Sequence, residues 1–509
     1  MIRLHRFAAL FVVVALLSAC ATGPGGDPTF NYRLLDDRDS GLAYAVRFAS
    51  EIPDRGARAE HFLEIAERYD DIGTGSQANA LRSFAEELVR LPDEDAAVSP
   101  AAVELARRHL AAGRTAQAAE LLDIAVSRVR ALPDRAEQAR VLREVVDLCF
   151  EEGDELFDVL RRAVEAVLVI DDLSTRVDIL TDASLRYQAE GVRQSANVLI
   201  QQAIPAAGNI TEPWARAAAF AAVAEAYRGI REEDRAERMM RDAFAAARNA
   251  DETPPGPAAT FLVRVIGFGR RFDALAVAEG VEESAARAVV LARIAESYDT
   301  PELRSSAFIL YARAVSAAGA VESGAERAET YLRVAESYLR FGEVELAVIQ
   351  AANAVSSLAR ADPQEREEEI MLRIADLFLR SDAPEEIRAL TAAAPTAAVL
   401  ARVSAHVAIG AAESYEEEAR DYLDRALGAR EDVEEESSRT SRDIVQAAAR
   451  FGRLDEALAE LTAMDEPVQL SEAATAFGYY AMRAGGLTEE QRGLLEEFYR
   501  EYRTRRRLE

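Results

Sequence analysis

A heptapeptide recurs in this chain at a fixed interval of 40 residues. Residues 292–298 read ARIAESY, residues 332–338 read LRVAESY and residues 372–378 read LRIADLF. A motif that repeats every 20 to 50 residues is typical of arrays in which each unit is one supersecondary element. We therefore expect a stack of similar units rather than the ~3 separate domains that the length of the chain alone would suggest.

Each unit has the spacing of a helical hairpin. In one copy a small residue, an aromatic residue, a glycine and a second small residue fall at Ala335, Tyr338, Gly342 and Ala347. Residues three or four apart share one helix face, and a glycine between two helices tolerates the positive φ that ends the first. The same offsets recur at Ala66, Tyr69, Gly73 and Ala78, at Ala106, His109, Gly113 and Ala118, and at Ser184, Tyr187, Gly191 and Ala196. One hairpin cannot bury its apolar face alone, so the units must stack.

This pattern resembles the tetratricopeptide repeat, and the match covers most of residues 55–460, or ten to eleven units. The resemblance implies an all-α fold, a right-handed α-solenoid of antiparallel helix pairs. The chain departs from the family in its period of about 40 residues rather than 34 and in lacking the early tryptophan of nearly every unit. The units are also irregular after Gly267, where Tyr298 of the aromatic column follows by only 31 residues, and at 380–420.

The first twenty residues form an export signal. Arg3 and Arg6 precede an apolar run at 7–16, which is shorter than the ~20 residues that span a bilayer. The run ends in Leu-Ser-Ala-Cys, which resembles the lipobox of bacterial lipoproteins. That resemblance implies removal of residues 1–19, lipid attachment with fatty acylation at Cys20, and an anchored mature protein. An ordinary signal peptide with a chance cysteine is the alternative.

The resemblance to lipoproteins also suggests where the protein resides. Ala21 follows the cysteine, and an alanine rather than an aspartate at this position favours the outer membrane, facing the periplasm. In a cell without an outer membrane, the anchor would lie on the outer face of the plasma membrane.

Five segments follow from these patterns. They are the signal peptide 1–19, the lipidated cysteine with a Gly/Pro-rich flexible tether at 20–30, N-terminal repeats at 31–250, C-terminal repeats at 251–486, and a capping helix at 487–509 with an arginine-rich end. The internal boundary is placed at 251–260, where the sequence DETPPGPAAT holds three prolines.

Composition excludes several classes of protein. The chain carries 89 acids and 60 bases, a net charge of −29, and every base is an arginine. A Walker phosphate loop and a Schiff-base enzyme both need a lysine, and nucleic-acid binding needs a basic surface. His61, His109 and His406 have no metal-ligand spacing, and Cys149 is expected to be a buried structural thiol. We expect no enzyme activity, no cofactor, no metal and no nucleic-acid partner.

One column of arginines lies near the starts of the predicted helices. Arg58, Arg176, Arg216, Arg287 and Arg327 each stand eleven residues before the aromatic column. Acids precede several of them, at Asp54, Asp172 and Glu212. We expect recurrent ion pairs that fix the angle between units.

A second arginine column repeats every 40 residues. Arg293, Arg333 and Arg373 are each followed three residues later by an acid, at Glu296, Glu336 and Asp376 respectively. Tetratricopeptide repeats bind peptides at the matching positions of their first helices, so the resemblance implies a ladder that binds peptides or proteins. The alternative is a set of i,i+3 surface pairs. The arginines at 503, 505, 506 and 507 either complement the helix dipole in solvent or contact an anionic partner.

The sequence thus predicts a membrane-anchored, non-catalytic scaffold or adaptor lipoprotein that holds envelope proteins or peptides on a concave surface. One alternative is a nutrient-binding outer-membrane lipoprotein, although a single tryptophan, Trp214, gives little aromatic surface for sugar stacking. A less favoured alternative is a cell-wall enzyme with a superhelical domain, for which no block outside the repeats remains.

Overall fold

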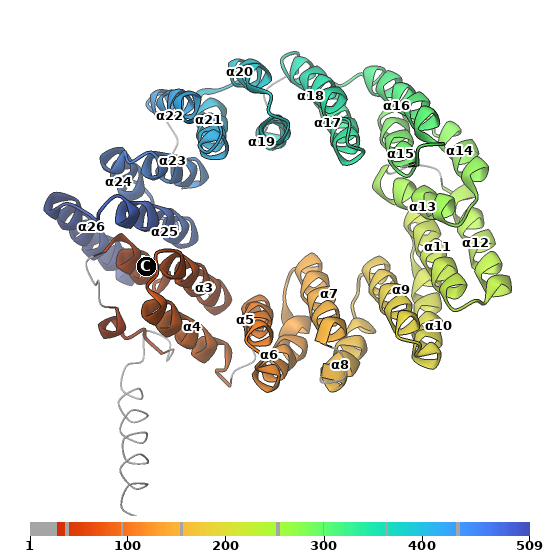
Figure 1. Ribbon diagram of the computed structural model, residues 1–509, viewed down its shortest axis with the longest axis horizontal. Helices are drawn as coiled ribbons and strands as arrows, with labels where there is room; N and C mark the ends of the chain where they lie inside the picture. The colour runs from red at the N-terminus through yellow and green to blue at the C-terminus, as the bar shows by residue number, and fades with distance from the viewer. Residues whose placement is uncertain are drawn as a thin grey trace, which may run out of the picture. The chain divides into compact units, whose positions relative to one another are not determined.

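The structure is a computed structural model that describes residues 28–35, 40–92, 95–152, 156–250, 255–298, 300–361, 365–433 and 438–508. Within these residues the chain is helical and contains no β-strand. Successive helices pair as antiparallel hairpins (Figure 1), which confirms the predicted all-α solenoid of helix pairs. No helix in the described part of the chain is long and apolar enough to cross a membrane.

The helices alternate between first and second members of hairpins. The first helices are α3 (Arg55–Asp71), α5 (Ser99–Ala111), α7 (Arg135–Glu152), α9 (Leu173–Ala189), α11 (Pro213–Gly229), α13 (Pro255–Gly267), α15 (Ser284–Glu296), α17 (Gly324–Arg340), α19 (Glu365–Arg380), α21 (Ala397–Ala411), α23 (Ser438–Arg450) and α25 (Pro467–Arg483). The second helices are α4 (Gly75–Val89), α6 (Thr115–Arg128), α8 (Phe157–Val167), α10 (Arg193–Asn209), α12 (Glu233–Arg248), α14 (Arg271–Glu279), α16 (Arg304–Gly319), α18 (Val344–Leu358), α20 (Pro384–Ala392), α22 (Glu416–Arg430) and α24 (Leu454–Thr462). The chain also has α2 (Gly41–Ala49), α26 (Glu489–Leu508) and the 3-10 turns η1 (Tyr32–Leu34), η2 (Ala96–Val98) and η3 (Val129–Ala131).

The turn inside each regular hairpin needs a left-handed residue. Gly342 has a φ of 86° between α17 and α18, and the turn glycines at 73, 113 and 191 also have positive φ. In the copy formed by Ala224, Tyr227, Arg231 and Ala236, an arginine stands in place of the glycine, and Arg231 adopts a φ of 63°. The turn therefore keeps its positive φ even at Arg231, where a residue other than glycine adopts this angle only with strain.

The aromatic column fills the space between helices that small residues bring together. Ala335 and Ala347 are fully buried, and Tyr338 is buried beside them. The ring of Tyr338 stacks on Tyr311 with centroids 4.0 Å apart, and the Tyr311 hydroxyl donates to the Ser337 carbonyl at 3.0 Å. Burial raises the pKa of Tyr338 to about 12, so its phenol stays neutral.

The irregular units have short second helices. Helices α14, α20 and α24 each have 9 residues, whereas α12 has 16 and α18 has 15. The second helix of each of these three hairpins is almost two turns shorter than in a regular hairpin. The first helix of the next hairpin therefore begins fewer residues further along the chain. This accounts for the shortened step after Gly267 and for the lost register at 380–420.

The described residues form two compact units. Unit 1 comprises Met1–Pro133, Glu151–Val159 and Ser437–Glu509, and unit 2 comprises Asp134–Phe150 and Leu160–Glu436. Unit 1 therefore contains helices from both ends of the chain. The prolines at 251–260 do not separate these two units: residues 251–254 lie outside the described residues, and α13 of unit 2 begins at Pro255.

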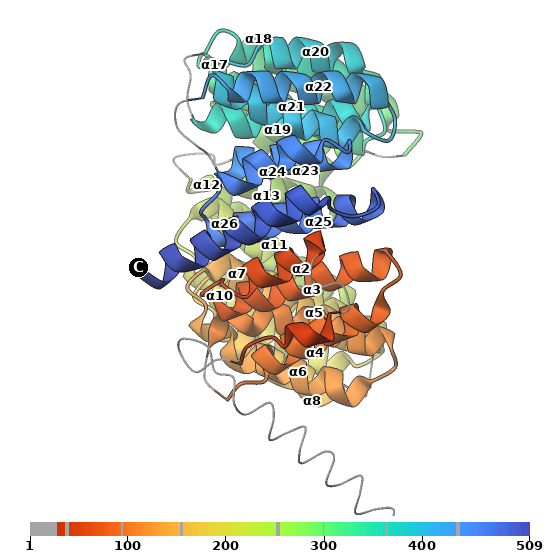
Figure 2. The same cartoon turned by 90° about the vertical axis from the view of Figure 1, so that its left-hand side faces the viewer.

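In unit 1 the first α-helix of the described residues completes the last hairpin. Helix α2 packs against α25 as extensively as α16 packs against α15 within a continuous hairpin (Figures 1 and 2). The two helices approach closely where Gly41 meets Gly478: a Cβ on Gly478 would lie 2.4 Å from the Gly41 carbonyl carbon. Helix α25 thus takes a second helix from the opposite end of the sequence.

Helix α26 then packs on α2. Phe498 and Tyr502 are buried, and their ring centroids lie 5.7 and 5.8 Å from that of Phe48. Arg47 pairs with Glu496 at 2.7 Å. The predicted capping segment is therefore a helix that packs on α2 within unit 1.

Order also begins earlier than the predicted tether suggests. Phe30 is 4% exposed and its ring lies 5.3 Å from Phe84 and 5.6 Å from Phe62. Residues 28–30, which were assigned to a flexible tether, therefore belong to unit 1. Residues 1–27, including Cys20, lie outside the described residues.

We predict that Gly478→Ala weakens unit 1. The added methyl would overlap the backbone of Gly41 and Leu42, which cannot move like a flexible side chain. The expected loss is about 1–3 kcal/mol in the free energy of unfolding, measured by denaturant titration followed by far-UV circular dichroism. In Gly428→Ala the new methyl meets nothing within 4 Å, so this control should gain about 0.5–1 kcal/mol. Equal stability of the two variants would contradict the close packing of α2 on α25.

Candidate functional site

The three arginines of the predicted ladder lie on neighbouring first helices. Arg293 is in α15, Arg333 in α17 and Arg373 in α19, and these helices pack side by side in unit 2. The interval of 40 residues equals one regular hairpin, so it places each arginine at the same level of its helix. Their side chains are 39%, 41% and 35% exposed, respectively.

Glu296 connects α15 to α17. Nη1 of Arg293 donates to the Glu296 carboxylate at 2.8 Å, within the same helix. From α17, Nε of Arg340 donates to the same carboxylate at 3.0 Å, and the Ser337 hydroxyl donates at 3.1 Å. One carboxylate therefore accepts from two successive repeats.

Glu329 and Glu336 connect α17 to α19. Nε of Arg333 donates to Glu329 at 2.8 Å. Arg373 donates to Glu329 at 3.0 Å through Nη1 and to Glu336 at 2.6 Å through Nη2. Arg373 thus forms a fork that spans two carboxylates of the preceding repeat.

Together these residues form a charged surface that we call the arginine ladder: Arg293, Glu296, Glu329, Arg333, Glu336, Arg340 and Arg373. Except for Glu296, these residues line a cavity of about 270 Å³ together with Val289. Four guanidinium groups face three carboxylates, so the arginine ladder has one excess positive charge in a chain whose net charge is −29.

The electrostatics of the arginine ladder favour the charged forms of Glu329 and Arg373. Burial raises the pKa of Glu329, but hydrogen bonds and charge from Arg333 and Arg373 outweigh it and hold that pKa below the ordinary value. Burial likewise lowers the pKa of Arg373, but the hydrogen bond and charge of Glu336 raise it above its ordinary value overall. Glu329 and Arg373 are therefore both charged at neutral pH.

The last predicted acid belongs to a separate contact. Asp376 lies 2.8 Å from Nε2 of His406, which is in α21. The hydrogen bond from His406 lowers the pKa of Asp376. Asp376 therefore links α19 to α21, one hairpin beyond the arginine ladder.

The pairing differs from the predicted i,i+3 pattern. Only Arg293 pairs with the acid three residues later. Arg333 pairs with Glu329, four residues earlier, and Arg373 pairs with two acids of the preceding repeat. Sequence reasoning missed Glu329 and Arg340, although both lie on the same helix as Arg333 at i−4 and i+7.

The first arginine column has a different partner from the one predicted. Arg216, Arg287 and Arg327 each donate to the carbonyl six residues earlier, at 3.3, 3.3 and 3.0 Å. Arg176 makes the same contact with Ile170, and Arg58 donates to Pro53. The carboxylates instead cap the helices: Asp54, Asp172 and Glu212 accept hydrogen bonds from backbone N–H groups at the starts of α3, α9 and α11. The arginines fix the loop between hairpins through its backbone.

The remaining candidate residues are mostly buried. His109 is 6% exposed and lies 3.3 Å from Glu86, and Cys149 is a buried thiol, as predicted. Burial lowers the pKa of His61. In the described residues no group of three or more metal-ligating side chains is clustered.

No protein-family model and no curated protein matches the chain. Among solved structures, a protein of Thermococcus onnurineus is 14% identical over 74% of this chain and 99% of its own, with a TM-score of 0.27. A signal-transduction ATPase with a tetratricopeptide repeat sensor from Pyrococcus horikoshii is 12% identical over 86% of this chain and 67% of its own, with a TM-score of 0.23. A circular tandem repeat protein is 15% identical over 92% of this chain and 97% of its own, with a TM-score of 0.16.

These similarities are too low for an argument about function. The fold itself is defined by the hairpins of the chain: it is an all-α array of tetratricopeptide-like helical repeats.

We predict that Glu329→Gln weakens unit 2 at neutral pH. The variant loses the ionised acceptor of Arg333 and Arg373, which should lower the free energy of unfolding by about 1–3 kcal/mol. Because the folded pKa of Glu329 lies below its unfolded value, this carboxylate stabilises the fold above the unfolded pKa, and the contribution disappears as the pH falls through the folded pKa. The difference in the free energy of unfolding between the variant and the wild type should therefore disappear at acidic pH.

Denaturant titrations at several pH values would measure this gap. Glu345→Gln on α18 is a matched control, since Glu345 is exposed and forms none of the ion pairs found among the described side chains. A pH-independent difference for Glu329→Gln would contradict the assignment.

Proposed function

We propose that this protein is a membrane-anchored, non-catalytic scaffold or adaptor lipoprotein whose helical repeats bind other envelope proteins or peptides. The arginine ladder carries the proposal. Arg293, Arg333 and Arg373 lie on consecutive first helices, their side chains are 35–41% exposed, and they line a cavity.

Binding would use the excess positive charge of the ladder. A carboxylate of the partner can enter the cavity and accept from the guanidinium donors that are not already directed at Glu296, Glu329 or Glu336. Arginine suits this role because its planar fork binds a carboxylate through two parallel hydrogen bonds. The glutamates hold the guanidinium groups in place before the partner arrives, which reduces the entropy lost on binding.

The fixed spacing of the ladder would provide selectivity. Successive arginines belong to successive repeats, so a partner must present its acidic groups at the spacing of neighbouring first helices. A flexible acidic chain that matches only one position would gain little. We therefore expect partners with at least two acidic side chains, or one acidic side chain and a C-terminal carboxylate.

The proposed location rests on the sequence of the export signal. Lipid attachment at Cys20 would hold the repeats at the outer membrane, facing the periplasm, or at the outer face of the plasma membrane in a cell without an outer membrane. Two or more acyl chains hold a protein on a bilayer stably, whereas one does so marginally.

We predict that Cys20→Ser releases the protein from membranes, because it removes the thiol that would carry the lipid. Fractionation of cells, with mass determination of the mature N-terminus, would measure this. Wild-type protein should partition with membranes and carry the acylated mass. A Cys20→Ser protein that still partitions with membranes would contradict the anchor, and Cys149→Ser is the matched control.

We also predict that the combined change Arg293→Gln, Arg333→Gln and Arg373→Gln reduces partner capture at least tenfold. Glutamine keeps a polar side chain but removes the charge and the planar fork. In-cell crosslinking followed by mass spectrometry would identify the partners of the wild-type protein and quantify the loss.

The control is Arg238→Gln, Arg241→Gln and Arg313→Gln, which removes three arginines from the second helices α12 and α16. It changes the net charge equally and should leave capture unchanged. Equal capture by the two triple variants, with the same far-UV circular dichroism, would show that the ladder does not bind the partner.

A further inference from the structure

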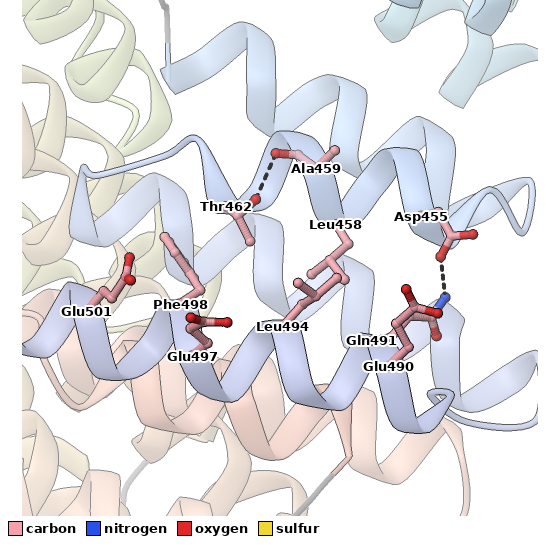
Figure 3. Close-up of a pocket in the computed structure, with 10 residues that line it drawn as sticks. All are labelled: Asp455, Leu458, Ala459, Thr462, Glu490, Gln491, Leu494, Glu497, Phe498 and Glu501. Atoms are coloured by element: carbon pink, nitrogen blue, oxygen red, sulfur yellow. Dashed lines mark hydrogen bonds between the residues drawn. The ribbon is translucent and has the colours of Figure 1, made fainter.

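A groove in unit 1 lies between α24 and α26, whereas the arginine ladder belongs to unit 2. Its volume is about 430 Å³, and its walls come from the outer sides of these two helices (Figure 3). The lining residues are Asp455, Leu458, Ala459 and Thr462 of α24 and Glu490, Gln491, Leu494, Glu497, Phe498 and Glu501 of α26.

The floor of the groove is apolar. Leu458 and Phe498 are 3% and 6% exposed and close its base, and Ala459 adds a small residue beside them. Leu494 stands at the centre and is 49% exposed. An exposed leucine between buried apolar neighbours can be covered by one further apolar side chain.

The rim of the groove is acidic. Asp455, Glu490, Glu497 and Glu501 contribute four carboxylates, and no base is among the lining residues. The three glutamates are exposed and take part in none of the ion pairs that the described side chains form. Nε2 of Gln491 donates to Asp455 at 2.8 Å, which ties α24 to α26 at one end of the groove.

The acids and the leucine follow one stripe of α26. Glu490, Leu494, Glu497 and Glu501 are spaced by four, three and four residues, so they share a helix face. Gly493 lies beside Leu494, and a Cβ at that position would meet nothing within 4 Å. The backbone of α26 is therefore open to a close neighbour next to the leucine.

A neighbouring side of α26 has its own contact. Leu495 and Tyr502 are buried, and Tyr502 packs against Phe48 of α2. Helix α26 is therefore held in unit 1 by α2 as well as by its contacts with α24.

We propose that this groove is a docking surface for a basic amphipathic helix of a partner protein. An apolar residue of that helix would cover Leu494, and lysine or arginine side chains on both sides would meet the four carboxylates. Helices that dock in this way place apolar anchors at i, i+3 or i+4 in a groove, and complementary charge sets their orientation. The proposal does not depend on the arginine ladder, which lies in unit 2.

A synthetic peptide pair tests this surface. The probe is a fluorescein-labelled 14-residue helix of leucine and lysine with one apolar stripe, and its control is a scrambled peptide of the same composition. Fluorescence anisotropy would measure binding to the full chain carrying Cys20→Ser. The amphipathic peptide should bind at least tenfold more tightly than the scrambled one.

Two groove variants separate apolar docking from charge attraction. Leu494→Glu should weaken binding of the amphipathic peptide at least tenfold, although it adds a negative charge that would strengthen a purely electrostatic contact. Glu490→Arg with Glu497→Arg should weaken it by a similar factor. Far-UV circular dichroism would verify that both variants are folded.

Matched controls lie outside the groove. Ile309→Glu replaces a 63% exposed apolar residue of α16, and Glu417→Arg with Asp421→Arg reverses two exposed acids of α22. Both should leave peptide binding unchanged. The charge-reversal pairs alter the net charge equally, so their comparison isolates the local contribution of the groove.

Three results would overturn the proposal. Equal binding of the scrambled peptide would show only general attraction to an acidic protein. Unchanged binding by Leu494→Glu would show that the groove is not used. Competition by a peptide of residues 500–509, together with a dimer in sedimentation that Leu494→Glu abolishes, would assign the groove to a second copy of this chain.

Discussion

Each first helix in this protein needs neighbours on two sides before its apolar residues are out of water. Fully buried residues such as Ala335 and Ala347 can reach that state only when the next helix comes close enough to exclude solvent. Inside the array, the adjoining hairpins meet this need. A terminal hairpin has no adjoining hairpin on one side, and many repeat proteins cover that side with a polar cap. This chain covers α25 with α2 instead, so the constraint that forms the hairpins also determines where α2 packs.

The sequence predicted the hairpin well because its signals are local. The glycine at 342 and the small and aromatic residues around it act within a single turn of helix or a single loop, and the structure confirms the positive φ that the spacing implied. The irregular units could be recognised in the sequence, because the spacing of the repeated motif changes there. Their cause, three second helices of nine residues, was not apparent, since a short helix has the same residue types as a long one.

The partners of the arginines could not be predicted in the same way. Arg373 donates to Glu329, which lies 44 residues earlier in the chain. A long arginine side chain can reach several acids of a neighbouring repeat, and the spacing along the sequence does not tell which one it contacts. One further signal was available and was missed. An isoleucine or valine stands six residues before Arg176, Arg216, Arg287 and Arg327, and it is the buried loop residue whose carbonyl accepts from the arginine. The recurrence of this pair indicates a backbone contact rather than an ion pair.

The split hairpin imposes a delay on the maturation of this protein. Eight of the nine residues of α2 are buried in the folded protein. Its contacts on α26 are 452 residues further along the chain, as between Tyr44 and Glu496. At 5–20 residues per second, a ribosome needs on the order of 20 to 90 s to make that stretch. Throughout this interval α2 lacks the helices α25 and α26, so residues 41–49 reach their full burial only after the C-terminal helices have been made.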